Sequence, residues 1–104
     1  MDIIKVAGSS RTSAVAGAIA GVFRDNRRAE VQAIGAGAVN QAIKALVLAR
    51  GYLEKDGYFI ACVPTFSDVE IDGKTRTAIK LYIEEHPSAS HIPAFSLEMH
   101  NNME

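Results

Sequence analysis

The chain has 104 residues and a formal net charge of −1, and 48% of its residues are hydrophobic and 22% charged. These values predict one ordinary globular domain and argue against a disordered or fibrous chain. The lone Cys62 excludes an internal disulfide, and the longest run of small apolar residues, 14–23, is too short to cross a bilayer. With no signal-peptide pattern at the N-terminus, we expect a cytoplasmic protein without a membrane partner.

The charge is divided unevenly along the chain. Residues 1–50 carry seven Lys or Arg against three acids, whereas residues 51–104 carry four against nine. Such an imbalance indicates either a face that binds a polyanion or two solvated surfaces of opposite sign.

The first half predicts a strand over 2–7, a turn over 8–13 and a helix over about 13–26. The serines and threonine of the turn suit helix N-caps. The helix has one stripe of large apolar residues, expected on a sheet. It also has a stripe of small residues, expected against another helix: Ala14, Gly17, Ala18 and Gly21.

A second strand over 29–34 leads through Gly35-x-Gly37 into a long helix that reaches about residue 53. Its apolar stripe includes Val39, Ile43 and Leu46, while Val47 falls outside the stripe. This surplus of apolar surface indicates burial against a partner chain as well as against the sheet.

The second half predicts an apolar strand over 58–63, of the kind found at a sheet centre, that Pro64 stops or bends. A hairpin over 66–84 follows, with its reversal at Asp72-Gly73. The resulting β-α-β-α-β-β order defines an α/β (α+β) two-layer sandwich, with both helices on one face of a mixed four- to five-stranded sheet. The remaining tail, from Glu85, predicts a surface extension that is either loosely held or docked on a neighbour.

The Gly35-x-Gly37 turn resembles half of a dinucleotide-binding fingerprint. The third glycine position is Asn40, and no acid lies about 20 residues on, so the fingerprint is incomplete. No Gly-Lys-Ser/Thr follows, which excludes a P-loop. Two readings remain: a helix N-terminus open to an anion, or glycines that serve only a tight turn.

The first turn offers Ser9, Ser10 and Arg11. Because helices on one face of a sheet place both strand-to-helix turns at the same end, these residues are expected beside Gly35 and Gly37 in one phosphate-binding patch. The alternative is an N-cap cluster with a solvated arginine.

The hairpin presents Lys74 and Arg76 on one face, as a β-ribbon does where it contacts nucleic acid. Three acids on the other arm, Asp68, Glu70 and Asp72, favour the alternative of a solvated hairpin.

No residue pattern predicts catalysis, a metal or a cofactor. Cys62 lies inside an apolar strand, so a place in the core is expected rather than a nucleophile. The three histidines lack metal-ligand spacing: His86, His91 and His100.

Several segments together resemble the stage V sporulation protein S (SpoVS) family. The matching segments are 4–7, 13–21, 30–44, 64–68 and 71–80. The resemblance implies a domain over residues 1–84 with the Alba-like fold, followed by an extension over 85–104 of unknown role. It also implies a homodimer that regulates sporulation and development through DNA or RNA.

Three functions therefore remain open from the sequence. The first is a dimeric regulatory protein whose two turns contact nucleic-acid phosphates weakly. In this hypothesis five further cations add only screening charge: Arg27, Arg28, Lys44, Lys74 and Arg76. The second is a protein-interaction scaffold that uses the excess apolar face of the second helix and the small-residue stripe of the first. The third is a site for a small phosphorylated ligand on the paired turns.

Overall fold

The computed structural model describes residues 2–87 and 93. Their order matches the predicted one, with these bounds: β1 Ile4–Val6, α1 Thr12–Asn26, β2 Arg28–Ala33, α2 Ala36–Lys55, β3 Ile60–Ile71 and β4 Lys74–Glu85. Most of the tail predicted over 85–104 lies outside the described residues.

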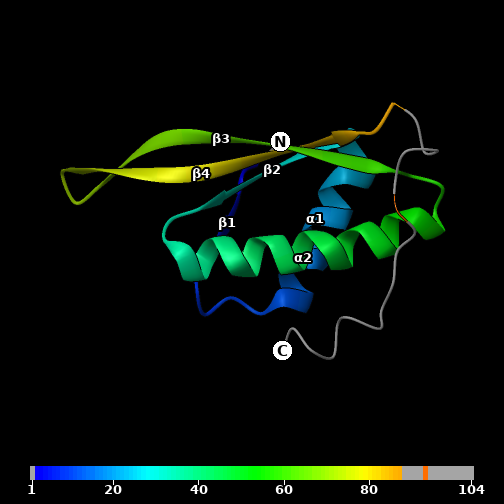
Figure 1. Cartoon of the computed structure of the whole chain (residues 1–104), viewed down its shortest axis with the longest axis horizontal. Coiled ribbons are helices and arrows are strands. Elements are labelled where there is room, and N and C mark those ends of the chain that lie inside the picture. Colours follow the sequence, from blue (N-terminus) through cyan, green and yellow to red (C-terminus); the bar gives the residue numbers. More distant parts are fainter. Residues whose placement is uncertain (1, 88–92, 94–104) are drawn as a thin grey trace.

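The four strands form one mixed sheet in the order β1-β2-β4-β3. β1 and β2 are parallel, and the other two pairs are antiparallel. Both helices cover the same face of this sheet, and no other described element covers the opposite face, which is called the open face below (Figure 1). The predicted two-layer α+β sandwich is confirmed, with four strands.

The core lies between the helices and the inner face of the sheet. α1 contributes Ile19 and Phe23, both fully buried, and β2 contributes Val31. α2 buries mainly alanines, at positions 38, 42, 45 and 49, together with Leu53. Because alanine is small, this face of α2 can approach its neighbours closely, and the larger aliphatic residues of α2 remain nearer the surface.

The predicted packing of the small-residue stripe on α1 is wrong. Ala14, Gly17 and Ala18 are exposed, and a Cβ added at Gly17 or Gly21 would meet nothing within 4 Å. α1 instead has one buried stripe, formed by Val15, Ala16, Ile19, Ala20 and Phe23. This single stripe is wide enough to contact both the sheet and α2. The helix therefore does not need a second packing face made of its small residues.

The predicted central position of the strand over 58–63 is also wrong, because β3 is an edge strand that pairs only with β4. Pro64 does not stop the strand, which continues to Ile71. A proline lacks the N–H that a central strand needs, so the edge position explains how it is accommodated.

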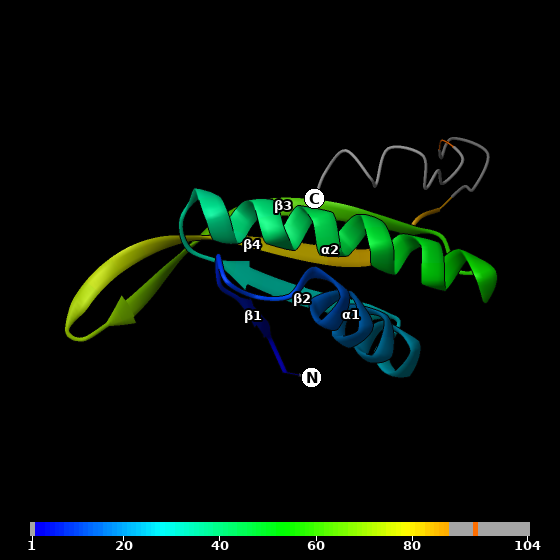
Figure 2. The ribbon, with the colours of Figure 1, turned by 90° about the horizontal axis from the view of Figure 1, so that it is seen from below.

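The hairpin reaches beyond the rest of the sheet. The β2–β4 pairing ends at Ala33 and Ile79, whereas the β3–β4 pairing continues to Ile71 and Lys74. Residues 67–78 therefore form a two-stranded arm, which projects past the start of α2 (Figures 1 and 2). At its tip both turn residues have positive φ, 50° at Asp72 and 77° at Gly73, as the predicted tight reversal requires.

Candidate nucleic-acid interface

The two strand-to-helix turns, residues 7–11 and 34–37, lie against each other and are called the paired turns below. A Cβ added at Gly37 would lie 3.7 Å from the Cα of Gly8, and one added at Gly8 would lie 3.8 Å from the backbone of Gly37. The two backbones therefore pass close enough that an added methyl group would fill the space between them. The prediction that both turns lie at the same end of the sheet is correct.

A side chain of α2 links the first of the paired turns to this helix. The amide nitrogen Nε2 of Gln41 donates to the carbonyl oxygen of Ser10 at 2.8 Å and to Oγ1 of Thr12 at 3.2 Å. Gln41 thereby fixes the start of α1 against the first turns of α2. The sequence reasoning missed this residue, because a glutamine inside a helix has no distinguishing pattern.

The serines of the first turn do not cap α1, contrary to the N-cap reading. Arg11 holds the N-cap position, and no side chain there bonds to the helix. The hydroxyl of Ser10 accepts from the backbone N–H of Ala7 at 2.9 Å, which stabilises the turn itself. Ser9 and Arg11 are exposed at its surface.

Neither helix has a side-chain cap or an acidic residue in its first turn. Backbone N–H groups at such an end have no intrahelical partner, and the helix dipole favours an anion near them. Gly35 is the N-cap of α2, with φ of 90°, and Gly37 lies within the first turn of the helix. The two glycines therefore have different roles: Gly35 supplies a left-handed conformation and Gly37 the contact with Gly8.

The arm separates its charges between its two faces. Residues directly opposite in an antiparallel pair share a face, and Val69 and Ile71 lie opposite Arg76 and Lys74. We call this the basic face of the arm. On the other face, Asp68 and Glu70 lie opposite two threonines, Thr77 and Thr75. In the sequence, these acids argued against a nucleic-acid contact by the two bases. In the structure, the acids and the bases lie on opposite faces of the arm.

The ion pairs of the described residues do not include the cations near the paired turns. The structure pairs Arg24 with Asp56 at 2.8 Å and Arg27 with Glu85 at 3.0 Å, both at the far end of the molecule. The other two pairs are Arg50–Glu54 and Lys80–Glu30. Within residues 2–87, no acid pairs with four cations of the paired turns, β1 and the arm: Lys5, Arg11, Lys74 and Arg76.

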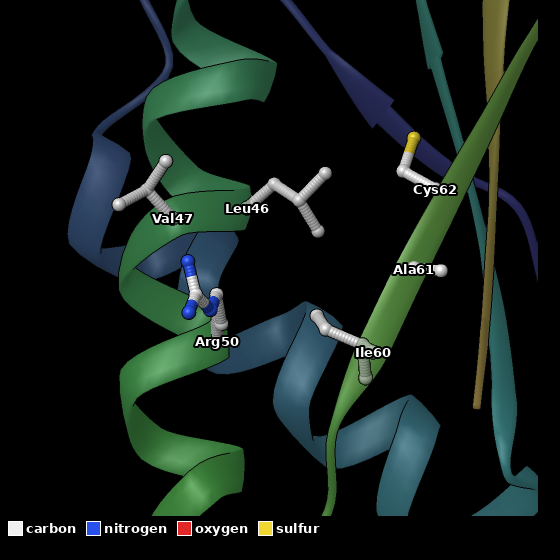
Figure 3. Close-up of a pocket in the computed structure, with 6 residues that line it drawn as sticks. All are labelled: Leu46, Val47, Arg50, Ile60, Ala61 and Cys62. Atoms are coloured by element: carbon white, nitrogen blue, oxygen red, sulfur yellow. The ribbon is translucent and has the colours of Figure 1, made fainter. Parts of the chain in front are cut away.

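A second surface is apolar and lies between α2 and the edge strand β3. It holds a groove of about 190 Å³, into which the side chains of Leu46 and Ile60 point (Figure 3). Its one cation, Arg50, is engaged by Oε2 of Glu54 at 2.6 Å and by the carbonyl oxygen of Pro93. Cys62 also lines the groove, and burial raises the pKa of its thiol above the ordinary value.

This apolar surface extends beyond the groove. Ile43 and Val47 of α2 are 42% and 38% exposed, and Phe66 of β3 is 77% exposed. The sequence predicted the apolar surplus of α2 correctly. It gave no sign that Phe66 would join it, because the edge position of β3 is set by the sheet order.

Two further classes of site are absent from the described residues. No group of three or more metal-ligating side chains occurs among them. No helix there has the length and hydropathy needed to cross a membrane.

The fold and these surfaces define a class: small two-layer α+β proteins with adjacent helix N-termini and a projecting β-hairpin arm. A family model described as stage V sporulation protein S matches residues 2–86. The chain belongs to this family, whose name refers to a stage of sporulation. The resemblance stated from the sequence is confirmed.

Proposed function

We propose that the protein is a dimeric regulator of sporulation or development that binds DNA or RNA through its phosphates. The contacts would come from the paired turns and the basic face of the arm. The residues are those predicted from the sequence: Ser9, Ser10, Arg11, Gly35, Gly37, Lys74 and Arg76. The protein acts by binding, without a cofactor, rather than by catalysis.

The observation that carries this proposal is the gathering of unpaired positive charge at one end of the molecule. Two uncapped helix N-termini meet there, Arg11 is exposed beside them, and the arm leaves from the same end (Figure 2). A phosphate is the ligand that both helix N-termini and cationic side chains favour. The small number of cations predicts weak binding that salt suppresses strongly.

The test is fluorescence anisotropy of labelled DNA and RNA oligonucleotides at low and at moderate salt. We expect binding at low salt that weakens steeply as salt rises. Arg11→Ala and the pair Lys74→Ala/Arg76→Ala should weaken binding. The matched control is Lys55→Ala, which removes an exposed lysine from the other end of α2. Absence of binding at both salt concentrations would contradict the proposal.

The dimer would form through the apolar surface of α2 and β3. Val47 lines the apolar groove, and Ile43 of α2 and Phe66 of β3 are further exposed apolar side chains on the two elements that form it. Side chains of this kind on one face are typical of a surface that another protein chain covers. A second copy of the chain is the simplest partner, because the same patch on both copies is self-complementary about a twofold axis.

A protein-interaction scaffold without affinity for nucleic acid is the second candidate, and the same apolar surface supports it. Light scattering separates the two. A stable assembly larger than a dimer that binds no oligonucleotide favours the scaffold. A dimer that binds oligonucleotides favours the regulator.

A further inference from the structure

A second groove lies between the arm and the carboxyl ends of β1 and β2, with a volume of about 400 Å³. β1 and the turn after it contribute residues 5–8, β2 and its end contribute Gln32 and Ile34, and β3 contributes residues 69–71. β1 and β3 lie at opposite edges of the sheet. The arm reaches β1 because a free two-stranded ribbon twists more strongly than a strand within a sheet.

Two polar side chains of this groove have no partner within the described part of the chain. Lys5 and Gln32 lie opposite each other in the β1–β2 register, so they share the open face of the sheet. No ion pair includes Lys5. No side-chain hydrogen bond engages Gln32, whereas the amide of Gln41 makes two.

The other walls of the groove are largely apolar. Ile34, Val69 and Ile71 contribute hydrocarbon surface, and Glu70 also borders the groove. Val69 and Ile71 lie on the basic face of the arm, opposite Arg76 and Lys74, whereas Glu70 belongs to the other face. The groove therefore combines largely apolar walls, one amide and one cation, with one acid at its border and two more cations on the same face of the adjoining arm.

We propose that this groove holds one unpaired nucleotide of a single-stranded nucleic acid. The apolar walls would contact the faces of the base, the amide of Gln32 would bond to its edge, and Lys5 would pair with its phosphate. Arg76 and Lys74 would contact phosphates farther along the strand. This inference rests on the proposed function and adds to it the kind of strand bound and two contact residues, Lys5 and Gln32.

Single-stranded nucleic acid fits this groove better than a duplex does. A volume of about 400 Å³ is in the range of a site for one small ligand, about 300–1,000 Å³. A base inside a duplex is stacked on both faces and cannot enter such a site, whereas an unpaired base presents both faces and its edge. No aromatic side chain lines the groove, so contact with aliphatic walls replaces aromatic stacking.

The test compares three labelled probes by fluorescence anisotropy at low salt: a ten-nucleotide single strand, its duplex, and an abasic strand of the same length. The abasic strand keeps the phosphates and lacks the bases. We expect the single strand to bind about tenfold more tightly than either other probe, the scale of one good hydrogen bond to a charged or buried group. Gln32→Ala should remove most of this preference. Lys5→Ala should weaken the single strand and the abasic strand alike, because both keep the phosphate, and Lys55→Ala should change neither affinity.

The outcomes separate the two proposals. If no probe binds the wild-type protein, both the proposed function and the groove assignment fail. If the three probes bind equally well, or if Gln32→Ala and Gln32→Glu both keep the preference, only the groove assignment fails. Both Gln32 variants change the open face of the sheet and leave the core residues in place, so circular dichroism melting verifies that they fold.

Discussion

Gly8 and Gly37, 29 positions apart in the chain, lie side by side: a Cβ on Gly37 would stand 3.7 Å from the Cα of Gly8. This close approach brings the start of α2 beside the end of β1. It places two uncapped helix N-termini side by side, and the candidate interface depends on it.

The two glycines of the second turn should respond oppositely to alanine. Gly35 has φ of 90° with open space around it, so Gly35→Ala should lower the free energy of unfolding by about 1–2 kcal/mol through backbone strain. Gly37 is helical, and a Cβ there meets only ordinary contacts. Gly37→Ala should therefore be neutral or stabilise by up to about 1 kcal/mol. Urea denaturation of both variants measures the difference, and equal losses would contradict the separate roles assigned here.

Gln41→Ala should destabilise the protein by about 1–2 kcal/mol, because it removes two hydrogen bonds that join α2 to the first turn and to the start of α1. Gln32→Ala is the matched control, since this half-buried glutamine makes no side-chain hydrogen bond within the described residues. Chemical denaturation of the two variants gives the comparison. If both lose the same stability, the link from α2 to the first turn is energetically unimportant.

Val47→Lys and Phe66→Ser should each shift the protein from dimer to monomer. Both side chains are exposed in the single chain, so their replacement should leave the fold intact while it adds charge or removes apolar area from the interface. Sedimentation velocity over a range of concentrations measures the shift. Ile71→Ser is the control, because Ile71 is comparably exposed but lies at the end of the arm. Dimers that persist in both interface variants would exclude this surface.

Arg11→Ala should reduce the salt dependence of nucleic-acid binding as well as the affinity. Each phosphate contact contributes about 0.7–0.9 to the slope of log K against log salt. Losing one contact should lower the slope by about that amount, and Lys55→Ala should leave it unchanged. A slope that stays constant in Arg11→Ala would mean that Arg11 does not touch a phosphate.

Cys62 should react slowly with thiol reagents. Burial raises the pKa of its thiol, so less thiolate is present at a given pH than in an exposed cysteine. The unfolded chain, with a thiol pKa of about 8.5, releases this proton first. The contribution of Cys62 to stability is therefore complete below that pH and is lost as pH rises from there through the raised pKa of the folded thiol. Alkylation rates and urea denaturation between pH 7 and 10 check this prediction, and Cys62→Ala should remove the pH dependence.

The sequence by itself determined the order of the elements and the presence of the Asp72-Gly73 reversal. Periodicity and turn residues are local properties, so each helix and strand can be recognised from its own residues. The Gly35-x-Gly37 turn and the apolar surplus of α2 were predictable for the same reason. The motifs that mark the family are also contiguous in the chain.

Tertiary structure alone decided which residues share a surface. The order β1-β2-β4-β3 put β3 at an edge, and it thereby exposed Phe66 and accommodated Pro64. Register divided the acids and bases of the arm between two faces, and twist carried the arm over Lys5 and Gln32. Strand order, register and twist each depend on residues far apart in the chain. The contacts that stabilise them lie between segments, so no single segment of the sequence reveals them. The sequence could therefore name Arg11, Lys74 and Arg76 as candidates, but it could not show that the acids near them in the chain face elsewhere.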